Sequence, residues 1–160
     1  MAISCSYEIP PDWDAIDGVR EQVIAYLRGR SEEPSVVDAI AMVVTELTEN
    51  AIKYGRFQSE TRVSVSLDVT DHAITVEVRN PTSNEDMIQL GRLDRTIQWI
   101  RGYQDPFEAY LARLQEVSMQ HPDSTESGLG LVRVAYEGES SLDFYLGEGG
   151  TLSVSAVYQR

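Results

Sequence analysis

Two polar side chains, Glu46 and Asn50, stand four residues apart within a helical pattern of apolar residues. At 3.6 residues per turn this spacing places them one turn apart on one helix face, and Lys53 extends that face. A carboxylate can accept a proton or orient water, an amide oxygen can ligate Mg²⁺, and an ammonium group can pair with phosphate. These residue types therefore suit a site that handles phosphate. The alternative is a solvated polar edge of an amphipathic helix.

A second feature is the run Gly128-Leu129-Gly130-Leu131, which follows Ser127 and opens a short apolar helix predicted up to Glu137. Glycines at the start of a helix let backbone N–H groups approach phosphate oxygens. The alternative is that the glycines permit a close approach of this helix to the sheet. The sequence leaves both interpretations open.

The composition bounds the class of protein. The chain has 160 residues, with 13 Lys+Arg against 26 Asp+Glu and a net charge of −13, and we expect a single domain over 1–160. The negative charge disfavours nucleic acid and acidic membrane surfaces as partners. Cys5 is the single cysteine and His72 and His121 are the only histidines, which disfavours a zinc site. Without a targeting segment or a long apolar run, we expect a soluble, cytoplasmic protein.

The period of the apolar residues predicts the elements that must position these side chains. Alternation predicts strands over 3–9, 63–69, 74–79, 142–146 and 152–158, of which the second and third, and the fourth and fifth, form hairpins. Helical spacing predicts helices between residues 12–29, 34–55, 87–102, 105–121 and 128–137. This order predicts an α+β two-layer sandwich, a mostly antiparallel mixed sheet with helices on one face. The strand over 3–9 is expected at a sheet edge, because two prolines end it.

Two of the predicted helices carry clear apolar faces. Leu90, Ile97 and Ile100 share one face of the first, and Phe107, Leu111 and Leu114 share one face of the second. We expect both apolar faces to pack on the core, with the polar faces turned outward.

Together these motifs resemble the GHKL superfamily, the histidine kinase-like ATPases. Residues 45–55 are similar to its N-box, residues 127–131 are similar to its G2 box, and the predicted element order agrees along nearly the whole chain. The resemblance implies the histidine kinase-like ATPase fold, Mg·ATP as cofactor, Glu46 as the catalytic carboxylate and Asn50 as the Mg²⁺ ligand. The other nucleotide-binding residues that it implies are Lys53, Asn80, Ser127, Gly128, Leu129, Gly130 and Leu131.

The chain departs from the family pattern at one box. The family has Asp-x-Gly-x-Gly, whose aspartate reads the adenine amino group, where this chain has Asn80-Pro81-Thr82-Ser83-Asn84. Asn80 keeps a side-chain oxygen that can accept one hydrogen bond from that amino group. The asparagine, a helical lid over about 85–127, Tyr110 and the late Gly-Leu-Gly-Leu resemble the SiaB-type protein kinases, stand-alone relatives of the anti-sigma-factor serine kinases.

The resemblance implies two alternative functions. The first is an ATP-dependent regulatory kinase that phosphorylates Ser or Thr of a small partner protein, STAS-like or sigma-factor-related, in a partner-switching pathway. The second is a degenerate member of the fold, with weak or no nucleotide binding, that acts as a protein-binding regulatory module. A third interpretation, from the residues alone, is a structural α+β domain whose motifs are accidental. A homodimer is compatible with all three.

Overall fold

The computed structural model describes residues 3–57, 62–82, 87–119, 129–147 and 149–160. The elements along these residues are β1 (Ile3–Ile9), α1 (Asp14–Gly29), α2 (Pro34–Tyr54), β2 (Val63–Val69), β3 (Ala73–Pro81), α3 (Met87–Arg101), α4 (Pro106–Ser118), α5 (Leu129–Tyr136), β4 (Ser140–Leu146) and β5 (Thr151–Gln159). This order confirms the predicted one. The predicted end of the fourth helix at His121 lies outside the described ranges.

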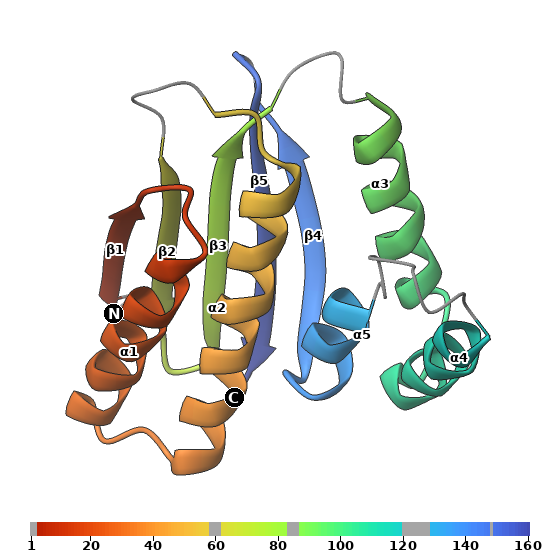
Figure 1. The fold of residues 1–160 in the computed structure, drawn as a ribbon. Coiled ribbons are helices and arrows are strands. Elements are labelled where there is room, and N and C mark those ends of the chain that lie inside the picture. The colour runs from red at the N-terminus through yellow and green to blue at the C-terminus, as the bar shows by residue number, and fades with distance from the viewer. Residues whose placement is uncertain (1–2, 58–61, 83–86, 120–128, 148) are drawn as a thin grey trace.

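The strands form one sheet in the order β1-β2-β3-β5-β4, and every neighbouring pair is antiparallel (Figure 1). β2 with β3 and β4 with β5 are the two predicted hairpins, and β1 lies at the predicted edge. The second hairpin joins the sheet through β5, whose Leu152 pairs with Asn80 of β3. This pairing places the end of β3 in the middle of the sheet, beside the end of α2 (Figure 1).

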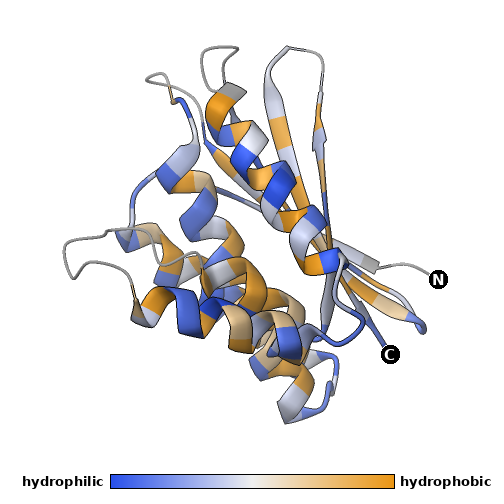
Figure 2. Ribbon diagram, turned by 90° about the vertical axis from the view of Figure 1, so that its right-hand side faces the viewer, coloured by the Kyte–Doolittle hydropathy of each residue, from blue (hydrophilic) through white to orange (hydrophobic). Residues whose placement is uncertain are grey.

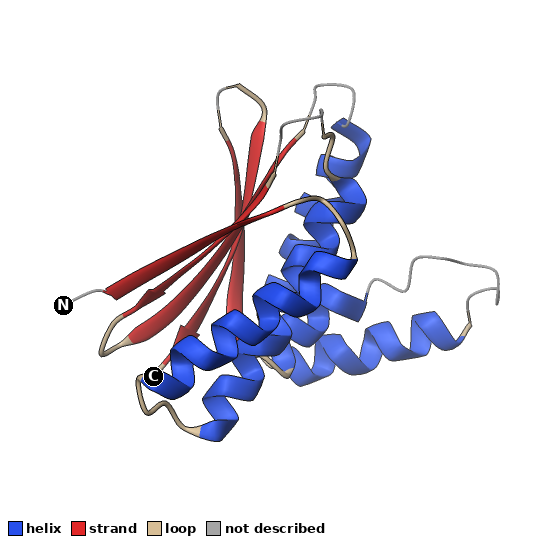
Figure 3. Ribbon diagram, turned by 60° about the vertical axis from the view of Figure 1, so that its left-hand side comes forward, coloured by secondary structure: helices blue, strands red, loops and turns tan. Residues whose placement is uncertain are grey.

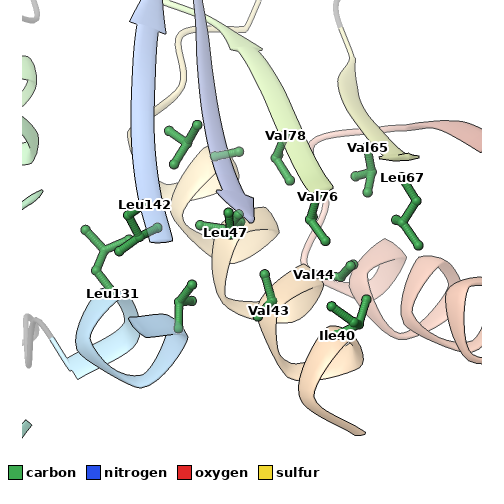
Figure 4. Close-up of a cluster of buried hydrophobic side chains, with 14 of the residues drawn as sticks. Ile40, Val43, Val44, Leu47, Val65, Leu67, Val76, Val78, Leu131 and Leu142 are labelled. Carbon is green, nitrogen blue, oxygen red and sulfur yellow. The ribbon is translucent and has the colours of Figure 1, made fainter. Parts of the chain in front are cut away.

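The helices cover one face of the sheet, so the fold is the predicted α+β two-layer sandwich (Figure 3). Alternation explains the layering, because the buried residues of β2 all point to the helical side while Ser64, Ser66 and Asp68 point to the other. The core lies between the layers, where α2 packs on the central strands (Figure 4). Its contributors from α2 are Val37, Ile40, Val43, Val44, Leu47 and Ala51.

One expectation about packing is wrong. Leu90, Ile97 and Ile100 of α3 are buried as predicted, but Phe107, Leu111 and Leu114 of α4 are 39%, 43% and 36% exposed. The physical reason is the place of α4, which packs mainly on α5 and secondarily on α3 rather than on the sheet. Its one buried residue is Ala109, and the apolar stripe lies on the other side of the helix. Of the predicted lid over about 85–127, residues 85–86 and 120–127 lie outside the described residues. No helix in the described part of the chain is long and apolar enough to cross a membrane.

Candidate functional site

A cavity of about 640 Å³ lies among α2, α3, α5 and the adjoining parts of β3 and β5. Its lining includes Glu46 and Asn50 from α2, Asn80 from β3, and Gly130 and Leu131 from α5. The fold therefore gathers in one place residues that the sequence supplies from three separate motifs. α4 closes part of the wall, since two of its side chains also line the cavity.

The α2 face follows from helix geometry. Glu46 and Asn50 lie one turn apart within Pro34–Tyr54, and both line the cavity while Val43 and Val44 are buried in the core. Lys53 also lines the cavity, and its Nζ lies 5.2 Å from the ring centroid of Tyr54. The interpretation of this face as a fully solvated edge is therefore wrong for Glu46, whose side chain is only 14% exposed.

The Glu46 carboxylate has a charged partner from the other side of the site. Arg133 of α5 donates from Nη1 to Oε1 of Glu46 at 2.9 Å, and it donates from Nε to Oε2 of Glu137 at 3.0 Å. One guanidinium thus bridges two carboxylates and fixes Glu46 at the edge of the cavity.

Burial sets the protonation behaviour of this carboxylate. Desolvation raises the pKa of Glu46, the nearby negative charge of Glu49 raises it further, and Arg133 acts in the opposite direction. The pKa of Arg133 is itself raised, chiefly by its hydrogen bond to Glu137, so the guanidinium stays charged. Glu46 is therefore a stronger proton acceptor than an exposed glutamate.

The glycine at position 130 makes a close approach possible. A Cβ placed on Gly130 would lie 2.6 Å from Oε2 of Glu46, a distance that real side chains do not adopt. The alternative interpretation of this glycine was a close approach of the helix to the sheet. The structure shows instead a close approach to the Glu46 carboxylate on α2. Leu131 lines the cavity, whereas Leu129 is not among the lining residues. Ser127 and Gly128 lie outside the described residues.

Asn80 lies near the end of β3, on the buried side of the strand, and lines the cavity. It is 3% exposed, and its Nδ2 donates to the backbone oxygen of Pro81 at 3.0 Å. This hydrogen bond holds the amide group of Asn80 at the cavity wall. Just beyond it, the N–H of Thr82 donates to the backbone oxygen of Gly150 at the tip of the second hairpin, at 2.7 Å.

Sequence reasoning missed several cations at the site. Arg92 and Arg95 of α3 and Arg113 of α4 line the cavity, and Arg113 also pairs with Glu116 at 2.6 Å. The spacing of Arg92 and Arg95 was a usable signal, because it places both on one helix face. Arg133 was also recognisable as the one charged residue in the apolar helix Leu129–Tyr136.

A metal ion at this site would depend on few protein ligands. In the described ranges no group of three or more His, Cys, Asp or Glu side chains is arranged to hold a metal. Mg²⁺ in nucleotide sites is usually held by one or two protein oxygens together with phosphates and water. The amide oxygen of Asn50 at the cavity wall fits that second type of site.

Comparison with known families decides the class of the chain. The model of the histidine kinase-like ATPase domain matches residues 9–135. The chain belongs to this family. The matched range runs from β1 into α5 and includes every cavity-lining residue named above. The predicted family and fold are thus confirmed.

A solved structure supports the same fold. One chain of the crystal structure of the SiaB–SiaC complex from Pseudomonas aeruginosa is similar to this histidine kinase-like chain with a TM-score of 0.73 and 24% sequence identity. The similarity covers 96% of this chain and 88% of that chain. No curated protein sequence matches.

Proposed function

We propose that this histidine kinase-like chain is an ATP-dependent regulatory kinase that phosphorylates Ser or Thr of a small partner protein. The observation that carries the proposal is the cavity that Glu46, Asn50, Asn80 and Gly130 line together, in a chain of an ATPase family. Its volume of about 640 Å³ is that of pockets for drug-sized ligands and cofactors.

The binding roles follow from the side chains at the wall. Asn50 offers Mg²⁺ an amide oxygen, and Lys53 offers a positive charge to phosphate. Asn80 offers its Oδ1 to the adenine amino group, in the place where the family has an aspartate. Bound Mg·ATP supplies the phosphoryl group for transfer and the cation that neutralises its charge.

Glu46 has the role of general base in this proposal. It accepts the proton of the acceptor hydroxyl, and the raised pKa of a buried carboxylate favours that task. Arg133 holds the carboxylate in place, and Gly130 leaves room beside it. Phosphoryl transfer depends mainly on the positioning of the reactants and on the neutralisation of charge. A carboxylate held beside the nucleotide can therefore serve as the base of this reaction.

A protein partner is part of the proposal. The solved relative belongs to a complex named SiaB–SiaC, which supports a small regulatory protein as the partner of this chain as well. We expect it to be STAS-like or sigma-factor-related and to act in a cytoplasmic partner-switching pathway. The net charge of −13 favours a partner with a basic surface over nucleic acid or an acidic membrane.

Calorimetric titration of Mg·ATP into the full chain tests the nucleotide site. We expect binding that requires Mg²⁺, and we expect Asn50→Ala to remove that requirement together with most of the affinity. Asp38→Ala, an exposed change on the same helix outside the cavity, is the matched control and should bind as the wild type does. An unchanged Mg²⁺-dependent affinity in Asn50→Ala contradicts the role of Asn50, and no heat of binding in the wild type contradicts the kinase.

A protein-binding module without nucleotide chemistry is the second candidate. It is favoured by the neutral Asn80 in place of an aspartate and by the ion pair that already engages Glu46. If this second function is correct, the partner binds the chain equally well with and without Mg·ATP. The partner then carries no phosphate after incubation with the chain and Mg·ATP.

A further inference from the structure

The apolar side chains Phe107, Leu111 and Leu114 form a continuous exposed row on α4, here called the α4 stripe. Their spacing places them on one face of the helix, and each is more than a third exposed. Tyr136 of α5, 37% exposed, extends the row, because its ring centroid lies 5.1 Å from that of Phe107. Figure 2 views the molecule from the side of α3 and α4 and shows hydrophobic residues interleaved with hydrophilic ones along the helices. Adjacent exposed apolar side chains are a common feature of protein interaction sites.

The chain offers little of its own to cover the α4 stripe. The helices that pack on α4 are α5 and α3, and the buried residue of α4, Ala109, lies on the opposite side of the helix. The stretch 120–128 that follows α4 reads Gln-His-Pro-Asp-Ser-Thr-Glu-Ser-Gly and contains no Ala, Val, Leu, Ile, Met, Phe, Tyr or Trp. Among the described residues the stripe is left exposed, and a partner molecule can bury it.

The charges around the α4 stripe select the kind of molecule. Asp105 and Glu108 are exposed at the start of α4, and Glu137, which is paired with Arg133, and Glu139 are exposed just after α5. Arg113, the one cation on α4, is already paired with a carboxylate of the same helix. A second copy of this chain would bring two such acidic borders together, each on a chain of net charge −13. A partner with Lys and Arg around its apolar contact is electrostatically complementary.

Arg113 and Glu116 of the same helix line the cavity wall, on the side of α4 opposite to the α4 stripe. We propose that the α4 stripe is the docking face for a protein partner that presents an apolar helix face bordered by Lys and Arg. The inference rests on the partner binding of the proposed function, and it names the surface and the chemistry of recognition. A partner docked there is held by α4, the helix whose other side forms part of the cavity wall.

Binding of three synthetic helical peptides, measured by fluorescence anisotropy with the full chain, tests the proposal. The Leu/Lys peptide carries leucine on one helix face and lysine on both borders of that face. The Leu/Glu peptide has glutamate in place of every lysine. The Ser/Lys peptide has serine in place of every leucine. We expect the Leu/Lys peptide to bind at least about tenfold more tightly than either of the others. If the Ser/Lys peptide binds as tightly as the Leu/Lys peptide, the net charges alone attract the peptide to the chain, and the proposal is overturned.

Variants of the chain locate the binding. The double variant Phe107→Ser/Leu114→Ser and, separately, Leu111→Glu should each weaken the Leu/Lys peptide about tenfold. Tyr145→Ser, which removes a 68% exposed ring on β4, is the matched control and should bind as the wild type does. Undiminished binding in both stripe variants overturns the proposal. So does a wild-type dimer in analytical ultracentrifugation that Leu111→Glu dissociates, because a second copy would then be the occupant.

Titration of Mg·ATP into the same variants separates this inference from the nucleotide site. The stripe variants should keep the Mg·ATP affinity of the wild type, since none of the three stripe residues lines the cavity. Peptide binding that depends on the stripe in a chain that binds no Mg·ATP would leave the docking face standing and the kinase contradicted. If the wild type binds Mg·ATP and the stripe variants bind the peptide normally, the nucleotide site stands and the docking face is contradicted.

Discussion

Arg133 on α5 and Glu46 on α2 are joined at 2.9 Å although 87 residues separate them in the sequence. This ion pair connects α5, which begins within the glycine motif, to the helix that carries the proposed base and metal ligand. Because Glu46 is largely buried, its charge state depends on this one cation and on the carboxylates around it. The pair therefore determines several measurable properties of the site.

Replacing Glu46 by Gln should remove a pH dependence of stability. Burial raises the pKa of Glu46 in the folded chain above its ordinary value of 4.5. The folded state then binds a proton at this site more readily than the unfolded state, so the contribution of Glu46 to stability is present below pH 4.5 and is lost as the pH rises through the folded pKa. Urea unfolding over a pH series should show the wild type losing stability relative to Glu46→Gln as the pH increases. Parallel curves would contradict the assignment of the shift to Glu46.

Replacing Arg133 by Gln should raise the pKa of Glu46 further. Arg133 is the influence that lowers it, and removing the cation leaves desolvation and the charges of Glu49 and Glu137 unopposed. Carbon NMR titration of the glutamate carboxyl groups measures the change. Arg20→Gln, which breaks an exposed pair with Glu21, is the control and should leave the Glu46 titration unchanged. An unmoved Glu46 titration in Arg133→Gln would count against the ion pair.

Gly130→Ala should destabilise the chain by about 1–3 kcal/mol, because the added methyl group meets the Glu46 carboxylate. In the background of Glu46→Ala the same change should be neutral or stabilising, since alanine is the better helix former once the contact is gone. Chemical denaturation of the four members of this cycle measures the coupling. Gly18→Ala on α1, where an added Cβ meets nothing within 4 Å, should stabilise by up to about 1 kcal/mol. Additive effects of the two changes would refute the close contact.

Glu46→Gln should reduce turnover far more than binding. A general base acts mainly in the transition state, so the amide should retain Mg·ATP affinity while phosphoryl transfer to the partner, or slow ATP hydrolysis, falls about a hundredfold or more. Calorimetry and a radiolabelled phosphate assay on the same preparation separate the two effects. Wild-type turnover in the variant would restrict Glu46 to a structural role.

A long-range ion pair at the other end of the molecule should contribute to stability. Arg160 donates from Nη2 to Oε2 of Glu32 at 2.7 Å and from Nη1 to the backbone oxygen of Thr70 at 3.0 Å, and the Glu32 side chain is only 7% exposed. Arg160→Ala leaves that buried carboxylate without its partner and should cost about 1–3 kcal/mol in denaturant unfolding. Arg20→Ala, at an exposed pair, should change stability by less than about 0.5 kcal/mol. Similar small effects in both variants would show that the Arg160 pair contributes little.

The helices, the strands and the polar face of α2 could be predicted from the pattern of residue types alone. Apolar residues at a period of two define the strands over 63–69 and 74–79, and a period of 3.6 defines α2, because these periods are local properties of the backbone. Four-residue spacing on a helix is enough to place Glu46 and Asn50 on one face. The two hairpins were also predictable, since short turns between adjacent strands leave antiparallel pairing as the simple solution.

The neighbours of each helix face could not be predicted from local patterns and became known from the packed fold. The apolar period of α4 shows that its face can be buried, but the position of α4 on α5 leaves Phe107, Leu111 and Leu114 uncovered. The pairing of Glu46 with Arg133, and hence the need for glycine at position 130, depends on how closely α5 approaches α2. Contacts between distant segments arise from the packing of whole elements, and no local period in the sequence specifies that packing.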